Sequence, residues 1–474
     1  MSLQAVPPEI IESICHCLDA LTIMKLAQVS RQFRRIVQSS ALQYKTQLEL
    51  AGLRDGQVGN FGSAARLDML KAYQAAWAGF DWSQSTQTTV PIHGLWELVG
   101  NVFATYSSET GFVFNRIPSP LRHIPDEQWS ITAVSCDVND FSMDLSLDLL
   151  LVVELNSSKS VVIHLLSLKT GRPHPLARQP RLSAELNSPS PSATYFYQIR
   201  IFGEYIGVMT EHEDEILELH VWEWKTGTLK KHIFEEHITS FAFLDHQRLL
   251  VSGFADLHPE LRVLEINDSP TDTTSFTFVL PELSLDPSDM EINIQTEPPP
   301  SWPANARLAE PFTTSHTDRL FVVSLGGWDS HELAFMLCIQ LSTILNLMDK
   351  PMNSAGHHTI SWEQWGPSTR MLRVPKLPEG WVCYVYGQRC VIQTDKTQWK
   401  ILDFNQFDLD PQSRIKHEKT VDRRCRMFAQ PVSTSAPFTL RSISIPHSIH
   451  AAMLAEDAIV AVLKDENLVT IFSI

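Results

Sequence analysis

Apolar residues recur along the chain with two different periods, and the period changes near residue 90. In the first forty residues they return every three or four positions, which is the spacing that gives a helix one apolar face. Three such stripes follow one another: Ile10, Ile11, Ile14 and Leu18; Ile23, Leu26 and Val29; and Phe33, Ile36 and Val37. Three helices of about ten residues bury too little surface to be stable alone. We therefore expect this unit to pack against another protein or against the rest of the chain.

Two further helices are predicted after this unit. Residues 41–51 are rich in helix-forming residues and are followed by Gly52, which is a signal for a helix C-terminus. Ser63 can cap a second helix over residues 64–78. The apolar stripe of that helix consists of Leu67, Leu70, Tyr73 and Trp77. We expect these two helices to set the angle between the N-terminal unit and the remainder of the chain.

From about residue 91 the period falls to two, which is typical of β-strands. Short β-rich runs alternate there with clusters of Gly, Pro, Asp and Ser. The predicted strands are residues 149–154, 161–168, 205–209, 217–224, 248–251, 261–266, 320–325, 381–386, 459–463 and 468–474. No comparable region alternates strands with long helices, so the pattern disfavours a parallel α/β sheet.

One internal repeat lies within the β-rich region. Residues 164–171 align with residues 220–227, and both segments begin with a histidine and end in Lys-Thr-Gly. The terminal Gly171 and Gly227 can supply the positive φ that a tight turn requires. Repeats of this length, each a small antiparallel sheet, indicate a β-propeller of about seven blades. A pair of β-sandwiches or an irregular all-β domain is the alternative.

The N-terminal unit also carries a more specific motif. Its first helix opens with Val6-Pro7-Pro8-Glu9. Its centre is Val29-Ser30-Arg31, and the aromatic Phe33 stands three positions after the serine. This combination resembles the F-box. A short amphipathic bundle that caps the larger domain is the alternative interpretation.

The resemblance implies that the unit docks on the small Skp-family adaptor of an SCF-type (adaptor, cullin, F-box) ubiquitin ligase. Pro7 and Pro8 lack N–H donors and fix φ near about −65°, which suits a helix start and a rigid apolar edge. The residues expected to contact the adaptor are Val6, Pro7, Pro8, Ile10, Ile11, Ile14, Leu18, Leu21, Met24, Leu26, Val29 and Phe33.

The chain is thus expected to be a multidomain α + all-β protein. We assign residues 1–45 to a three-helix F-box domain, residues 46–90 to a helical linker and residues 91–474 to a β-propeller-like substrate-binding domain. Residues 1 to about 90 are also similar to F-box proteins that are numerous in mushroom-forming fungi, because Leu-Gln-Tyr-Lys and an Arg-Leu-x-x-Leu-x-x-Tyr-x-x-Ala-Trp helix follow the motif.

Composition narrows the classes of partner and compartment. The net charge of −16 argues against a nucleic-acid partner, which requires a basic surface. Apolar runs such as residues 149–153 are too short to span a bilayer, so no membrane partner is expected. Seven scattered cysteines without a Cys-x-x-Cys pair fit a reducing compartment, and we expect a cytoplasmic or nuclear protein.

No group of residues in the sequence predicts a catalytic or metal-binding site. His331-Glu332 begins like a zinc-protease motif, but Phe335 stands where the second histidine is needed. Adjacent His357 and His358 and the acidic run at residues 211–215 are more typical of solvated turns than of metal ligands. We therefore expect no catalytic residue, no metal site and no cofactor.

These observations favour a non-catalytic substrate-recognition subunit of an SCF-type ligase. The F-box would bind the Skp-family adaptor and, through it, cullin, while the propeller would bind an unidentified target protein. The alternatives are an interaction protein that acts outside a cullin ligase, and an enzyme whose site lies in the propeller's central channel.

Overall fold

The computed structural model describes most of the 474 residues. The described residues are 6–56, 61–79, 86–92, 94–156, 160–187, 196–211, 217–235, 238–255, 258–267, 275–284, 290–297, 310–315, 318–327, 334–350, 356–378, 382–395, 398–405, 414–415, 420–422, 427–444, 449–463 and 468–474. Among them, no helix has both the length and the apolar character needed to cross a membrane.

The N-terminal part is helical, as its apolar stripes predict. Its helices are α1 (Pro8–Cys15), α2 (Ala20–Val29), α3 (Arg31–Val37), α4 (Ser40–Leu50) and α5 (Ser63–Ala78). The side chains of Asp19, Ser30 and Ser39 accept N–H bonds in the first turns of α2, α3 and α4, and each such cap contributes about 1 kcal/mol to helix stability. The caps explain why four helices, α1 to α4, separated by one to four residues, do not merge into one.

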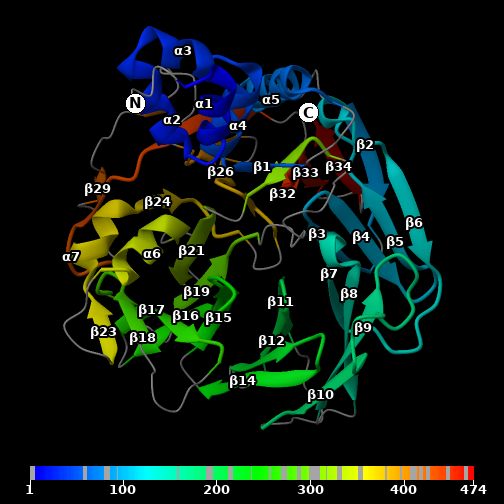
Figure 1. Ribbon diagram of the computed structural model, residues 1–474. Helices are drawn as coiled ribbons and strands as arrows, with labels where there is room; N and C mark the ends of the chain where they lie inside the picture. The colour runs from blue at the N-terminus through cyan, green and yellow to red at the C-terminus, as the bar shows by residue number, and fades with distance from the viewer. Residues whose placement is uncertain are drawn as a thin grey trace.

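The rest of the chain forms a propeller of seven antiparallel blades, which confirms the predicted fold (Figure 1). The first four blades are β3–β6 (Leu95–Val99, Val102–Ser107, Gly111–Arg116, Glu127–Ile131), β7–β10 (Asp140–Asp144, Leu149–Asn156, Ser160–Ser167, Arg181–Glu185), β11–β14 (Phe196–Phe202, Tyr205–Glu211, Leu217–Glu223, Thr228–Glu235) and β15–β18 (Ile238–Phe243, Arg248–Ala255, His258–Glu265, Ser275–Val279). Blade 4 gains a fifth, parallel strand, β23 (His357–Ile360).

The last three blades depart from simple chain order. Blade 5 is β19, β21, β22 and β24 (Met290–Gln295, Leu320–Gly327, Ala334–Gln340, Arg370–Val374), with α6 (Leu341–Met348) and α7 (Trp362–Trp365) inserted before its last strand. Blade 6 is β25, β26, β27, β31 and β28 (Val385–Tyr386, Arg389–Asp395, Gln398–Asp403, Phe438–Ser444, Arg414–Ile415). Blade 7 is β32, β33, β34 and β2 (Ile449–Leu454, Ala458–Leu463, Leu468–Ser473, Thr86–Pro91).

Blade 7 closes the ring because it takes strands from both ends of the β-rich region. The strand β2 precedes blade 1 in sequence, yet it pairs antiparallel with β34, with Thr86 opposite Ser473 and Pro91 opposite Leu468. Opening the ring would therefore break a full strand pair. Because β2 spans residues 86–91, it begins inside the stretch that the sequence assigned to the helical linker.

Nine of the ten predicted strand segments coincide with observed strands, and one does not. Residues 381–386 were expected to form a strand, but β25 covers Val385–Tyr386 alone. The alternation of Val382, Tyr384 and Tyr386 reflects burial of these side chains, while the backbone of residues 382–384 is irregular. The prediction for this segment was therefore wrong in length.

The core lies between neighbouring blades. On β8, Leu149, Leu151 and Val153 pack toward blade 3, whereas Leu150 and Val152 pack toward blade 1. All five side chains have no exposed surface. A blade strand buried on both faces needs apolar residues at consecutive positions, which explains runs that do not alternate with polar residues.

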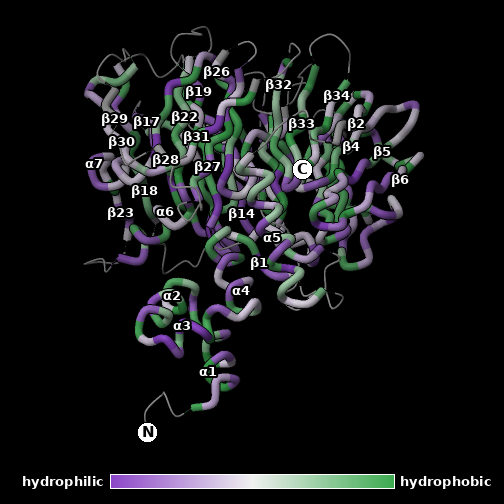
Figure 2. Tube along the Cα trace, turned by 90° about the horizontal axis from the view of Figure 1, so that it is seen from above, coloured by the Kyte–Doolittle hydropathy of each residue, from purple (hydrophilic) through white to green (hydrophobic). Residues whose placement is uncertain are grey.

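The propeller has two faces that differ in their relation to the linker. Because successive strands are antiparallel, the turns between the first and second strands of all blades lie at one end. Two of these turns contact the linker, since Gln388 packs against Gly52 and the carbonyl of Glu456 accepts a bond from Tyr73. We call this end the linker face and the opposite end the distal face. Helices α1–α3 stand away from the propeller and reach it through α4 (Figure 2).

Candidate functional site

The F-box region has a small core of its own. Ile11, Cys15, Ile23, Phe33 and Leu42 form one cluster and are each at most 5% exposed. The sequence named Ile11 and Phe33 among the adaptor contacts, but the structure places both side chains inside this cluster. Their role in the structure is to hold α1, α3 and α4 together.

Several of the other named side chains point outward. We call the exposed apolar set the residues Pro7, Pro8, Ile10, Ile14, Leu21, Met24 and Val29. The remaining three, Val6, Leu18 and Leu26, are half-buried against the small core. Of the eight large apolar side chains that are exposed among the described residues, five lie between residues 10 and 29, and Val29 reaches 70% exposure. Such a concentration in one small unit is typical of a protein-interaction site.

Helix α4 is shared between the F-box and the propeller. On its F-box side, the Lys45 ammonium donates to the carbonyl of Leu18 (2.5 Å), and the Glu49 carboxylate accepts from the N–H of Ala20 (3.0 Å). Lys45 and Glu49 also pair with each other at 3.2 Å. These bonds satisfy backbone groups in the turn between α1 and α2, so the turn is fixed to α4.

The other side of α4 faces the propeller. The Tyr44 hydroxyl donates to the carbonyl of Pro311 at 2.9 Å, and Leu48 is buried in the largest apolar cluster of the protein. The Arg66 guanidinium of α5 lies 4.9 Å from the Tyr44 ring centre and pairs with Asp55 at 2.6 Å. One helix thus contributes to two cores, which couples the orientation of the F-box to the propeller.

The linker is docked along most of its length. Strand β1 (Leu53–Asp55) pairs antiparallel with β20 (Phe312–Thr314) from the propeller. On α5, the Tyr73 hydroxyl donates to the carbonyl of Glu456 (2.7 Å), and the Arg389 guanidinium lies 4.7 Å from the ring centre of Trp77. The predicted stripe of α5 is therefore buried against the propeller.

A buried ion network joins the linker to the closing blade. The Arg122 guanidinium, which has no exposed surface, bonds to Asp457, to Glu456 (2.9 Å) and to the carbonyl of Phe312 (2.6 Å). The guanidinium also lies 5.8 Å from the ring centre of Tyr73. Blade 1, blade 7, β20 and α5 meet at this one side chain.

The central channel holds buried carboxyl groups. Its cavity of about 100 Å³ is bordered by Glu97, Asp144, Glu297 and Arg200, and the described lining contains no histidine or lysine. Burial is the largest cause that raises the pKa of Glu97 to about 8 and that of Glu297 to about 7. These carboxyls are neutral for part of the time near pH 7, and Glu97 contacts Cys383 at 3.5 Å. No local pattern of the sequence identifies this group, because its members come from four different blades.

The residues that set the F-box orientation were also missed from the sequence. Lys45 and Glu49 sit one turn apart on α4, a spacing that reads as an ordinary helix ion pair. Arg122 and Asp457 carry no local signal at all, since they meet only when the ring closes. His357 and His358 face different partners: His357 bonds to Ser275 and His358 packs on Phe276.

Comparison with known proteins supports the assignment of the N-terminal unit. Residues 3–46 match the F-box-like family model. No curated protein matches the chain. Solved structures similar in fold include BamB from Moraxella catarrhalis (10% identity, TM-score 0.35, 82% of this chain and 100% of that chain) and U3-55K (10%, 0.39, 82% and 98%). The WD40 domain of SCAP from fission yeast is a third (9%, 0.35, 82% and 95%).

At these scores the assignment of blades rests on the strand pairing itself and not on the similar structures. The family match and the helix packing agree on the N-terminal unit. The chain therefore combines an F-box-like domain with a seven-bladed β-propeller, an arrangement typical of non-catalytic interaction proteins.

Proposed function

We propose that the protein is the target-recognition subunit of an SCF-type ubiquitin ligase, with the exposed apolar set bound to a Skp-family adaptor. The observation that carries the proposal is that the F-box-like unit buries one part of its apolar residues and exposes another. Ile11 and Phe33 complete its core, while Leu21 and Val29 project into solvent. A unit that is already folded around its own core, yet leaves this much apolar surface, is suited to a second polypeptide.

The subunit would work by positioning. Holding a target lysine near the charged ubiquitin carrier raises the effective concentration of the two groups, to the order of millimolar for a short flexible tether and higher when the joint is stiff. The bonds of Lys45 and Glu49 on one side of α4, and of Tyr44 on the other, supply that stiffness. No bond-making residue of this chain is needed.

The proposal also assigns the target to the distal face of the propeller. The linker helix α5 and the β1–β20 pair occupy part of the linker face. The distal face lies at the opposite end of the blades from α5 and the β1–β20 pair, and it carries the turns between the second and third strands of the blades. Surface loops on a rigid scaffold are where binding residues concentrate.

Binding of the purified chain to a Skp-family adaptor tests the first half of the proposal. Leu21→Ala with Val29→Ala removes two exposed aliphatic groups, each worth about 1.5 kcal/mol or more when buried by a partner, so we expect at least about 100-fold weaker binding. Leu229→Ala is the matched control, because Leu229 is 47% exposed on blade 3 and Leu21 is 49% exposed. Equal affinities for the double variant and the wild type would refute the assigned surface.

A second measurement separates the ligase from the main alternative. Affinity purification of the wild-type chain should recover adaptor and cullin together, and the double variant should lose both while keeping its target proteins. Recovery of adaptor without cullin would instead identify an F-box/propeller interaction protein that acts outside a cullin ligase.

A further inference from the structure

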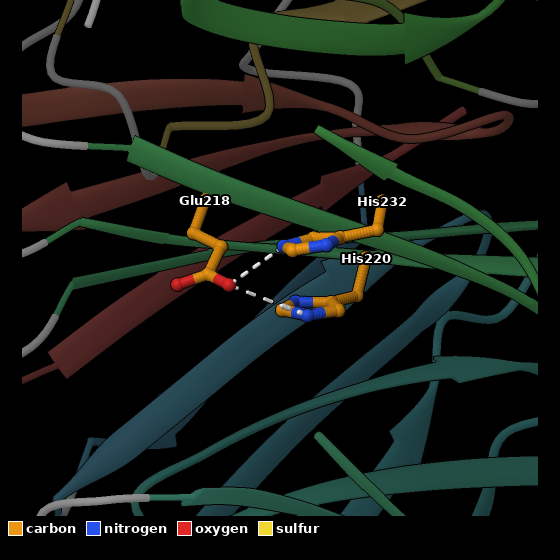
Figure 3. Close-up of side chains that lie close together, drawn as sticks. All are labelled: Glu218, His220 and His232. Atoms are coloured by element: carbon orange, nitrogen blue, oxygen red, sulfur yellow. Dashed lines mark hydrogen bonds and ion pairs between the residues drawn. The ribbon is translucent and has the colours of Figure 1, made fainter. Parts of the chain in front are cut away.

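Near the distal face, blade 3 carries a group of three side chains of the kinds that bind metals, one glutamate and two histidines. Glu218 and His220 lie two residues apart on β13 and share one face of the strand, and His232 lies directly opposite His220 on β14. The Glu218 Oε1 atom is 2.7 Å from His232 Nε2 and 3.5 Å from His220 Nε2. Both rings direct the same nitrogen at the same carboxylate oxygen (Figure 3).

We propose that Glu218, His220 and His232 bind one zinc ion. Two imidazoles and one carboxylate form a three-ligand set of the kind that leaves a fourth position open. The three candidate ligand atoms all lie within 4.8 Å of one another. In a tetrahedral site with zinc–ligand distances of about 2.0–2.2 Å, ligand atoms are about 3.3 Å apart. The two observed separations fall on either side of that value. The His220 and His232 rings are stacked nearly parallel, at 10°, so the rings must tilt toward each other for both Nε2 lone pairs to meet one ion.

The surroundings hold these ligands in place. The Asn187 side chain donates to Glu218 Oε1 (2.8 Å), and its backbone N–H donates to Oε2 (3.0 Å). The His220 ring stacks on His232, with ring centres 4.4 Å apart, and on Trp222, with ring centres 5.4 Å apart. Hydrogen bonds such as those from Asn187 to Glu218 orient a ligating carboxylate.

Burial also suits a bound cation. Glu218 has no exposed surface and His220 is 4% exposed, whereas His232 is open to solvent and gives an ion a route of access. A neutral imidazole with its proton on Nδ1 offers the Nε2 lone pair to a metal.

The preceding blade supplies an internal comparison. His164 is the repeat-equivalent of His220, and its Nε2 atom lies 2.7 Å from a carboxylate oxygen of Glu154. The residue opposite His164 on the outer strand is Arg181, where blade 3 has His232. Arginine keeps its charge and offers no lone pair, so blade 2 forms an ion pair while blade 3 presents a second imidazole.

The site would fasten the outer edge of blade 3. His232 belongs to β14, the outermost strand, and a bond through zinc to β13 adds a cross-link that hydrogen bonding alone does not give. The fourth coordination position of the zinc ion would lie on the side of the exposed His232, at the end of the blade remote from the linker. This inference does not depend on the proposed ligase function, because it concerns the propeller alone.

Zinc binding to the untagged, full-length protein tests the proposal. After dialysis against a chelator, we expect calorimetric titration with zinc chloride at pH 7 to show one high-affinity site. His232→Gln removes an exposed ligand with little risk to folding, and it should weaken binding by more than about 100-fold, the upper end of the loss caused by changing a ligand's partner. His164→Gln is the matched control and should bind as the wild type does.

A second readout covers the case in which a variant folds poorly. Zinc should raise the unfolding temperature of the wild type and of His164→Gln, but not of His232→Gln or Glu218→Gln, and cobalt should give the visible absorption of a tetrahedral site in the first two proteins. The absence of a site tighter than roughly 10 μM, or equal zinc affinity for the wild type and His232→Gln, would show that the three residues form a hydrogen-bonded group without metal.

Discussion

The guanidinium of Arg122 and the carboxylate of Asp457 bond in the interior of the protein although 335 residues separate them in sequence; Nε of the arginine lies 2.8 Å from Oδ1 of the aspartate. Neither side chain has exposed surface. Ser119 and Asn101 of the same part of the chain also bond to Asp457. A buried ion pair thus links the first blade to the closing blade, in addition to the hydrogen bonds between strands.

Removal of Arg122 should weaken ring closure strongly. Arg122→Ala leaves the buried carboxylates of Glu456 and Asp457 without their cation, a loss that typically costs about 3–5 kcal/mol of unfolding free energy. Urea unfolding followed by tryptophan fluorescence measures the change, and Arg172→Ala, at an exposed arginine, is the control. Replacing Arg122 and Asp457 together by leucine should recover part of the loss. If Arg122→Ala unfolds at the urea concentration of the wild type, the network does not support closure.

Two adjacent isoleucines should behave differently. Ile11 is 3% exposed and Ile10 is 51% exposed. Ile11→Ala creates a cavity in the small F-box core and should destabilise that unit by about 2–4 kcal/mol. Ile10→Ala should leave folding unchanged and weaken adaptor binding by about tenfold or more. Hydrogen exchange of residues 8–37 and adaptor affinity measure the two effects, and a loss of F-box protection in Ile10→Ala would contradict the division.

Ile10 and Ile11 also show how much of the structure could be predicted from the sequence. Periodicity found the helices, since caps such as Asp19 and Ser30 and the apolar stripes are local signals. Periodicity could not predict that Ile11 is buried and Ile10 exposed, because a wide apolar stripe includes both the side chains that pack inward and those that remain exposed for a partner. The two Lys-Thr-Gly turns were equally local, and Gly171 and Gly227 adopt positive φ as expected.

Features formed between distant segments could not be predicted in this way. The pairing of β2 with β34 depends on closure of the whole ring. The contact between Glu218 and His232 depends on the register across a hairpin, which shifts by one residue between Val221 and Trp222. Spacing along the chain contains no information on such a shift, so it does not bring Glu218 and His232 together, although His220 belongs to the internal repeat.

Substitutions in α4 should alter the rigidity of the connection between the F-box and the propeller. Tyr44→Ala with Leu48→Ala removes the Pro311 bond and a buried aliphatic group, and so should loosen α4 from the propeller. We expect target ubiquitination in a reconstituted reaction to fall several-fold, while adaptor and target affinities stay within about twofold, because effective concentration depends on the stiffness of the connection.

A flexible Gly-Ser insertion after Gly79 serves as the comparison for the α4 double variant. Residue 79 lies in the helical linker that the sequence predicts to set the angle between the halves, but Tyr73, Trp77 and the β1–β20 pair hold the linker to the propeller independently of that residue. We therefore expect the insertion to leave ubiquitination nearly unchanged. A larger loss from the insertion than from the α4 double variant would show that the docked contacts do not set the geometry.

The channel carboxyls should make stability fall as pH rises above about 5. Burial, followed by the neighbouring Asp140, raises the pKa of Glu97 to about 8, whereas an unfolded chain releases that proton near the ordinary value of 4.5. Between these values the folded state holds a proton that the unfolded state has lost, so the free energy of unfolding decreases with pH, by at most about 1.4 kcal/mol per pH unit for one proton.

Glu97→Gln isolates this contribution, because glutamine keeps the shape of the neutral acid and has no proton to lose. Urea unfolding between pH 5 and pH 8.5 should show a smaller decrease for Glu97→Gln than for the wild type, and the variant should be the more stable of the two at the upper end. Glu109→Gln, at an exposed position, should follow the wild-type profile. Parallel profiles for Glu97→Gln and the wild type would mean that Glu97 ionises as readily in the folded protein as in the unfolded chain. That result would contradict the conclusion that the Glu97 carboxyl is protonated in the folded channel.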